Sequence, residues 1–76
     1  MMEEPLGDAK ILYALASMKM PYGKYKGYVL RFLPVAYLEW FSQKGFPKNT
    51  LGIYMQSLYE IKLNGLEYLF NKIKVT

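Results

Sequence analysis

The sequence of 76 residues contains no cysteine and no histidine. The absence of cysteine excludes disulfide bonds and a thiol nucleophile, and the absence of both residue types excludes the common zinc ligand sets. Without histidine there is also no imidazole to act as a general base. The core is therefore stabilised by packing alone, for which 53% hydrophobic and 17% aromatic residues provide the material.

Long apolar runs are absent as well. The length predicts one domain, which we place at residues 8–76 after a disordered leader at residues 1–7. No run of about 18 apolar residues is present, so the sequence predicts no membrane-spanning segment. The N-terminus, Met-Met-Glu-Glu-Pro, is acidic and no apolar region follows it, which argues against a secretory signal. With no cysteine to favour an oxidising compartment, we expect a cytoplasmic protein.

Charge is distributed unevenly along the chain. Three of the six acidic residues, Glu3, Glu4 and Asp8, lie in the first eight positions. The remaining positions hold ten lysine and arginine residues against three acidic residues, a difference of +7. A basic body attracts anionic partners over long range, but such charge also keeps a small domain soluble when it has no anionic partner. Both interpretations stay open on charge alone.

Helical patterns cover most of the chain. Apolar residues at helical spacing after Asp8, a good N-cap, predict a first helix over residues 8–18. Pro34 and Gly45 bracket a second helix at residues 35–44, because proline suits a helix start and glycine suits a helix end.

The C-terminal half predicts two more helices. Asn49 or Thr50 caps a third helix, whose apolar residues follow in a three-to-four rhythm up to the stop at Asn64-Gly65. Apolar residues at helical spacing after this stop predict a short last helix.

Between the first two helices, the sequence predicts a β-hairpin. A proline ends the first helix and two glycines four positions apart follow it, with strands around residues 20–22 and 28–32. Tyr28, Leu30 and Phe32 would then share one strand face. The predicted fold class is α+β: a small, mostly helical domain in the order helix, β-hairpin, three helices.

Catalytic machinery is not recognisable in the sequence. General acid–base catalysis needs a positioned pair of titratable groups, but Glu39, Glu60 and Glu67 have no spacing that would bring them together. None of the three serines lies in a nucleophile motif. We therefore expect a protein that is not an enzyme and that holds no cofactor and no metal.

The turn from Tyr22 to Gly27 is the most informative segment. Glycines allow close approach of a ligand to the backbone, lysines attract phosphate, and tyrosine rings offer a stacking face to unpaired bases. The same residues have a purely structural interpretation, in which the glycines close the hairpin, the tyrosines cap the core and the lysines keep the turn soluble. The candidate nucleic-acid-binding residues of this turn are Tyr22, Gly23, Lys24, Tyr25, Lys26 and Gly27.

Three further basic residues extend the candidate site. Arg31 follows on the second predicted strand, and Lys44 and Lys48 flank the Gly-Phe-Pro loop, whose Phe46 we expect in the core. Whether these residues share a face with the turn is not determined by the sequence. We expect Trp40 to be a partly buried core residue rather than a stacking platform.

Several blocks of the sequence resemble a known family. The segments Met20-Pro-Tyr-Gly-Lys-Tyr-Lys-Gly27, Trp40-Phe41 and Lys44-Gly-Phe-Pro47 are similar to the small bacterial domain described as a putative quorum-sensing-regulated virulence factor. The resemblance covers residues 8–70, and Tyr22 departs from it because the family usually has phenylalanine there. It implies that residues 23–27 belong to the signature block of the family, and it implies no catalytic residue.

The front half of the chain is also similar to a module at the C-terminus of some DnaQ-like exonucleases, and this context implies an accessory contact to nucleic acid. From the residues and the resemblance together, we expect a non-catalytic binding module for DNA or RNA. The alternative is a protein–protein interaction module or a self-associating regulatory module. The sequence does not determine the oligomeric state.

Overall fold

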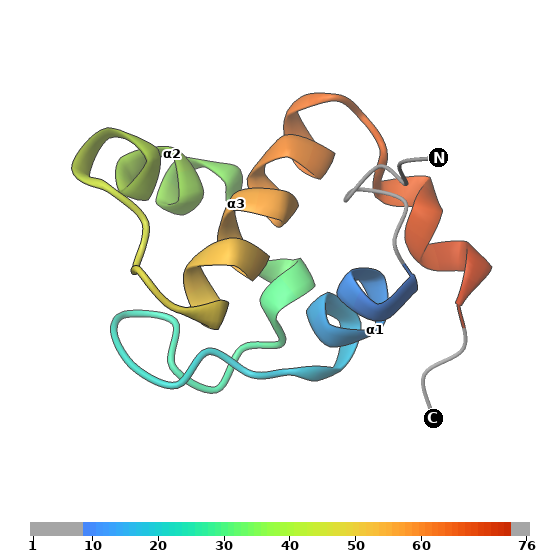
Figure 1. Ribbon diagram of the computed structural model, residues 1–76, viewed down its shortest axis with the longest axis horizontal. Helices are drawn as coiled ribbons and strands as arrows, with labels where there is room; N and C mark the ends of the chain where they lie inside the picture. Colours follow the sequence, from blue (N-terminus) through green and yellow to red (C-terminus); the bar gives the residue numbers. More distant parts are fainter. Residues whose placement is uncertain (1–8, 74–76) are drawn as a thin grey trace.

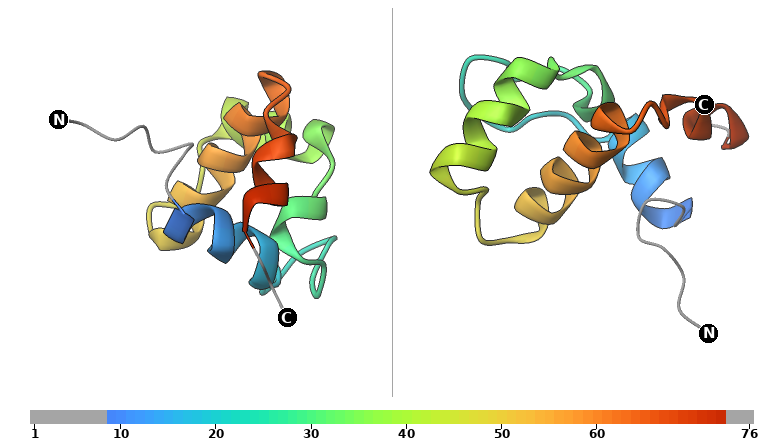
Figure 2. Two further views of the ribbon diagram at one scale, coloured as in Figure 1. Left: turned by 90° about the vertical axis from the view of Figure 1, so that its right-hand side faces the viewer. Right: turned by 90° about the horizontal axis from the view of Figure 1, so that it is seen from above.

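The computed structural model describes residues 9–73, which form a small helical domain (Figure 1). The helix α3 lies in the middle, packed against α1, α2 and the short η2, while η3 packs on α1 (Figures 1 and 2). The predicted leader at residues 1–7 and the predicted cap Asp8 lie outside the described residues. The elements follow the order α1 (Ala9–Ser17), 3-10 helix η2 (Leu30–Phe32), α2 (Val35–Lys44), α3 (Thr50–Leu63) and 3-10 helix η3 (Glu67–Lys72).

Local signals in the sequence set the bounds of α2 and α3. Pro34 stands immediately before α2, and Gly45 ends it with a φ of 106° while donating its N–H to the carbonyl of Phe41 at 2.6 Å. The side chain of Asn49 caps α3, since its Oδ1 accepts a hydrogen bond from the N–H of Gly52 at 3.1 Å. The predicted second and third helices are therefore confirmed at these ends.

The end of α3 is tied to the C-terminal segment. Gly65 has a φ of 66°, which turns the chain after Asn64, whose side-chain amide donates to the carbonyl of Glu60 at 2.7 Å. Lys62 then forms an ion pair with Glu67 at 2.9 Å, which joins α3 to the start of η3. The predicted short last helix is present in this place as a 3-10 helix.

The prediction of an α+β fold with a β-hairpin is wrong. Residues 9–73 contain no β-strand, and the predicted strands at residues 20–22 and 28–32 are replaced by a single antiparallel bridge between Lys19 and Val29. The chain does reverse direction here, but it enters the 3-10 helix η2 immediately after the bridge. The fold is therefore all-helical within the described residues.

Burial explains why the second strand does not form. Leu30 and Leu33 are both fully buried, whereas Phe32 is 62% exposed and Tyr28 is 51% exposed. An extended strand would place Tyr28, Leu30 and Phe32 on one face, but the core takes two leucines three positions apart. That spacing requires helical geometry, and Pro34 closes the segment directly afterwards.

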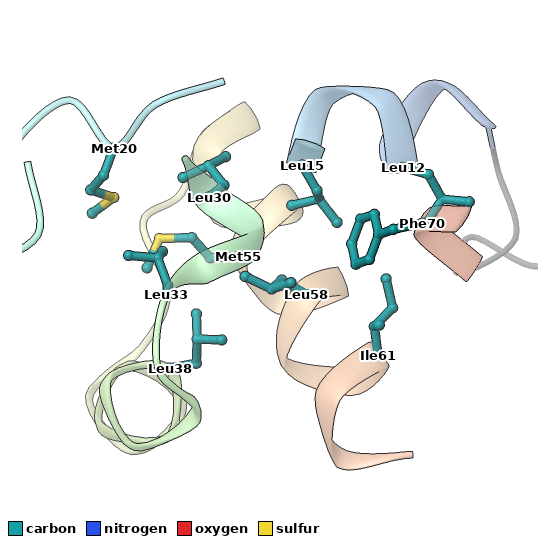
Figure 3. Packing of buried hydrophobic residues seen from close by; sticks show 10 residues of the cluster. All are labelled: Leu12, Leu15, Met20, Leu30, Leu33, Leu38, Met55, Leu58, Ile61 and Phe70. Atoms are coloured by element: carbon teal, nitrogen blue, oxygen red, sulfur yellow. The ribbon is translucent and has the colours of Figure 1, made fainter. Parts of the chain in front are cut away.

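The core is a single apolar cluster to which every described element contributes (Figure 3). Met55 and Leu58 of α3 face the side chains of η2 and α1, and Phe70 of η3 lies between Leu12 and Ile61 (Figure 3). Since no disulfide is possible, the burial of these side chains carries the stability of the domain. The cluster comprises Leu12, Leu15, Met20, Leu30, Leu33, Leu38, Met55, Leu58, Ile61 and Phe70.

The prediction of core positions is confirmed for Phe46 and wrong for Trp40. Phe46 is partly buried and packs against the cluster, as predicted. Trp40 is 53% exposed and contacts the ring of Phe41 edge to face, so the prediction of a core tryptophan is wrong. The reason is its position on α2, because Leu38 already occupies the inward stripe of this helix and Trp40 lies away from it.

A close backbone contact fixes the loop before α3. A Cβ atom placed on Gly52 would lie 1.6 Å from the carbonyl oxygen of Pro47, so only glycine fits at this position. Glycine inside a helix costs about 1 kcal/mol relative to alanine, and this contact is the structural reason for accepting that cost. The loop at residues 45–49 therefore lies directly on the first turn of α3.

No helix in the range 9–73 combines the length and the apolar character that crossing a membrane requires.

We expect the substitution Gly52→Ala to lower the free energy of unfolding by about 2 kcal/mol or more, although alanine is the better helix former. The added methyl group meets the backbone of Pro47, which cannot rotate away as a side chain does. Urea unfolding followed by circular dichroism measures the change. Gln56→Ala, at an exposed position one turn later, is the control and should change stability by less than about 0.5 kcal/mol. A Gly52→Ala variant as stable as the parent would contradict this interpretation.

Candidate functional site

The turn predicted as the binding site is closed by backbone hydrogen bonds. The N–H of Met20 donates to the carbonyl of Tyr28 at 2.8 Å, and the N–H of Gly27 donates to the carbonyl of Met20 at 2.8 Å. A third bond, from Leu30 to Met18 at 2.8 Å, continues the same pairing. We call residues 22–28 the basic turn, and these bonds hold its two ends together.

Both glycines of the basic turn have backbone conformations that favour glycine. Gly23 has a φ of 86° and Gly27 has a φ of 90°, both in the left-handed half of conformational space. A Cβ atom on Gly23 would also lie 3.0 Å from the hydroxyl oxygen of Tyr37, whereas a Cβ atom on Gly27 would meet nothing within 4 Å. Turn closure therefore accounts for both glycines, and close packing against α2 adds a second reason at Gly23.

Tyr25 anchors the basic turn to α2. Its ring meets that of Tyr37 edge to face with a centroid distance of 4.7 Å, and it meets that of Tyr28 in the same way at 5.1 Å. Edge-to-face pairs of this kind contribute about 0.5–1.5 kcal/mol each beyond the area that they bury. Tyr25 is half-buried in these contacts, so it holds the turn in place and has little free ring face to offer a ligand.

The ring contacts continue from Tyr37 along α2 and into α3. Tyr37 meets Phe41 at 5.1 Å, Phe41 stacks on Phe46 at 6.4 Å, and Phe46 meets Tyr59 of α3 at 6.3 Å. We call this series the aromatic row, and it connects the basic turn at the start of α2 to the loop that follows α2. Its members are Tyr28, Tyr25, Tyr37, Phe41, Phe46 and Tyr59.

The remaining side chains of the basic turn are open to solvent. Tyr22 and Tyr28 are 46% and 51% exposed as whole residues, and Lys24 and Lys26 are exposed on either side of Tyr25. The Nζ atom of Lys24 lies 5.6 Å from the centroid of the Tyr25 ring, a cation–π contact that leaves its charge in solvent. Neither lysine forms an ion pair with a described residue. The turn therefore presents two free cations beside two accessible rings.

The structure separates the three remaining candidate residues from the turn. The guanidinium of Arg31 lies over Phe70 at 4.5 Å and over Phe32 at 5.0 Å, so it packs toward η3. Its Nε atom is buried and has no hydrogen-bond partner among the described residues. Lys44 at the end of α2 and Lys48 in the loop that follows it are exposed, and neither forms an ion pair with a described residue. The aromatic row links this loop to the turn, and Arg31 lies outside the row.

A pocket of about 420 Å³ lies between this loop and α3. The sequence does not predict this pocket, because the pocket forms only where the loop lies on the first turn of the helix. A glycine in the interior of a predicted helix was the available signal, since such a glycine often marks a close approach of two backbones. The pocket is lined by Gly45, Phe46, Pro47, Lys48, Asn49, Gly52, Ile53 and Gln56. Tyr28 and Tyr37 were not among the predicted site residues, and the aromatic row brings both to the site.

Burial raises the pKa of the Tyr37 phenol above its ordinary value, because partial loss of water disfavours the phenolate. The nearby phenols of Tyr22 and Tyr25 raise this pKa further, since negative charges on neighbouring rings would repel.

The comparisons with known proteins identify relatives without a described activity. The sequence profile of the family described as "Putative quorum-sensing-regulated virulence factor" matches residues 8–73. The chain is 45% identical over 64 residues to the uncharacterised protein YpeB of Escherichia coli K12, covering 83% of this chain and 89% of that protein. The protein of the same name from Escherichia coli O157:H7 matches equally. No solved structure matches the chain significantly. The similarity to the module of DnaQ-like exonucleases is outside these findings and stays a prediction.

We expect Gly23→Ala to destabilise the protein more than Gly27→Ala. Both variants place a side chain at positive φ, which costs about 1–2 kcal/mol. Only Gly23→Ala also pushes against Tyr37, whose ring is held between Tyr25 and Phe41. Urea unfolding of the two variants isolates this contact as the difference between them. Equal losses, or a larger loss at Gly27, would show that the turn does not depend on its contact with α2.

We expect the stability of the protein to fall more steeply at alkaline pH than that of a Tyr37→Phe variant. Because the pKa of Tyr37 is raised in the folded protein, the unfolded chain releases this proton first. The contribution of the phenol is full below about pH 10 and is lost as the pH rises through the raised pKa. Urea midpoints at about pH 8 and about pH 11 measure the slope, with Tyr13→Phe as the control for loss of an exposed phenol. Parallel slopes for all three proteins would contradict the prediction.

Proposed function

The chain belongs to the family of the putative quorum-sensing-regulated virulence factor, and from this premise we propose that it is a non-catalytic module that binds single-stranded nucleic acid through the basic turn. The family description names a regulatory association and no biochemical activity, so the proposal is based on the surface of this chain.

The observation that carries the proposal is that the three tyrosines of the turn have different environments. Tyr25 faces inward and fixes the turn on α2, while Tyr22 and Tyr28 keep accessible rings. Stacking of a base on an aromatic ring contributes about 1–3 kcal/mol, and it depends little on which base is present. A turn that is already held in one conformation loses little entropy when a strand binds to it.

The charge of the turn is the second contribution to the proposed binding of nucleic acid. Lys24 and Lys26 have no carboxylate partner among the described residues, so their charges are available to phosphates. Neutralising phosphates releases counterions from the nucleic acid, and binding therefore weakens as salt rises. Residues 9–76 carry a net +7, which attracts a polyanion toward the whole domain before the turn makes contact.

An unpaired strand fits this site better than a duplex. Accessible rings at a turn stack on bases only when those bases are unpaired, and the described residues of the turn present no helix or ribbon to enter a major groove. DNA and RNA both satisfy these requirements, and we propose that the protein meets its ligand in the cytoplasm.

Protein binding is the second candidate function, and the exposed apolar residues of η2 and α2 favour it. Phe32, Val35 and Trp40 are all exposed, and large accessible aromatic side chains are common in protein interfaces. A partner covering this surface, or a second copy of the chain, would be detected by light scattering.

Fluorescence anisotropy with a labelled oligothymidine of about twelve nucleotides tests the proposal, since sites on such modules span about 4–16 nucleotides. We expect the affinity to fall steeply between about 50 mM and 200 mM salt. Lys24→Ala with Lys26→Ala should lower the slope of log K against log salt by about 1.4, because about 0.7 is lost for each phosphate contact on a single strand. Tyr22→Ala should weaken binding by about 1 kcal/mol or more without changing that slope.

Lys44→Ala with Lys48→Ala is the matched control, because it removes the same charge from the other end of α2. If the turn is the primary site, this second pair has the smaller effect on the binding of an oligothymidine of about three nucleotides, which is too short to span α2. Equal effects of the two pairs would mean that net charge alone attracts the strand. No binding by the parent protein at low salt would reject the proposal.

A further inference from the structure

The pocket between α3 and the loop at residues 45–49, which we call the α3 pocket, combines apolar walls with a polar rim. Phe46, Pro47 and Ile53 form the apolar part, and Ile53 is 59% exposed although it is a large aliphatic residue. The volume of about 420 Å³ lies within the range of small-molecule sites, about 300–1,000 Å³. The pocket therefore has room for a ligand group of the size of a base.

The walls of the α3 pocket are held rigidly. The backbone of Pro47 lies against Gly52 so closely that no side chain fits between them. Phe46 is fixed between Phe41 and Tyr59 of the aromatic row, and Asn49 is fixed by its bond to the N–H of Gly52. A site that exists before its ligand arrives avoids the cost of ordering loops on binding.

The polar rim holds groups that can form hydrogen bonds to the edge of a base. Asn49 uses its Oδ1 to cap α3, which leaves its NH₂ group without a partner among the described residues, and Gln56 is exposed with both amide atoms free. Primary amides can donate to and accept from the edge of a base. Lys48, also at the rim, is exposed and forms no ion pair within residues 9–73, so it can contact the phosphate that precedes or follows such a base.

The basic turn and the α3 pocket lie at opposite ends of α2. The turn contacts Tyr37 in the first turn of this helix, and the pocket begins at Gly45, directly after its last residue. Seen from above, α2 runs from the turn toward the loop that leads into α3 (Figure 2). Ten helical residues span about 15 Å. This length corresponds to about four nucleotides at a stacked spacing of about 3.4 Å.

We infer that the α3 pocket holds one unpaired base of the same strand that binds the basic turn, so that the strand crosses α2 between two subsites. The inference rests on the proposed function, because it assigns a second contact to that ligand. Charge favours this occupant over an apolar peptide side chain, since Lys44 and Lys48 have no carboxylate partner among the described residues and lie where a polyanion would leave α2.

The test compares two exposed aliphatic residues of α3. Ile53 lines the pocket and Leu63 does not, but both are 59% exposed, so Ile53→Ala and Leu63→Ala remove similar surface at similar cost to the fold. Gln56→Ala is the third variant and removes the amide at the rim. Each is titrated with labelled oligothymidines of about twelve and about three nucleotides, of which only the longer reaches both subsites.

With the longer strand, we expect Ile53→Ala and Gln56→Ala each to weaken binding about fivefold or more, and Leu63→Ala to bind like the parent. With the shorter strand, all three variants should bind like the parent, because it occupies the basic turn alone. Amide NMR signals of Gly52 and Ile53 should shift with the longer strand.

Two results would overturn the inference while the proposed function stands. In the first, the longer strand binds the pocket variants as tightly as the parent, while loss of Lys24 and Lys26 weakens it. In the second, the pocket variants weaken the short and the long strand by the same factor, so no distant second subsite exists. If no oligonucleotide binds the parent protein, the proposed function fails and the inference fails with it.

Discussion

The edge-to-face contact between Tyr25 and Tyr37 is the interaction on which the arrangement of this surface depends. It joins a turn without regular secondary structure to a helix, at a centroid distance of 4.7 Å. Gly23 closely approaches the hydroxyl of the same Tyr37, and burial raises the pKa of that phenol. The aromatic row passes through the same contact, because Tyr37 also meets Phe41 edge to face. A segment that would otherwise be a loose loop becomes a fixed part of the domain.

The helices of this protein are predictable because each has a local signal at its ends. The proline before α2, the glycine after it and the asparagine before α3 act within a few residues of their own position. The prediction of a hairpin was wrong because packing against distant parts of the chain determines the structure of this segment. Leu30 and Leu33 both enter the core, and their spacing selects a 3-10 helix although the turn residues favour a hairpin.

The candidate site was predictable only in part, because the sequence shows its local composition but not its packing. The segment from Tyr22 to Gly27 stands out by its composition, but the sequence does not say which tyrosine ring faces inward. Tyr25, which was predicted to stack, is the anchor, and Tyr28, which was not predicted as a site residue, is exposed as Tyr22 is. Arg31 belongs to a different contact with Phe70. The α3 pocket depends on the approach of Pro47 to Gly52, and the glycine inside the predicted helix is a local sign of a close approach that does not say which backbone approaches.

The exposed position of Trp40 has a practical consequence for work on this protein. It is the single tryptophan of the chain, and it lies on α2 beside Phe41, between the residues that contact the turn and the loop that follows the helix. The emission of an indole changes with its contact with water. The tryptophan emission of the unmodified protein, excited selectively over that of its eight tyrosines, therefore comes from one known point on this helix. Any molecule that covers α2 can be followed by that signal without a label.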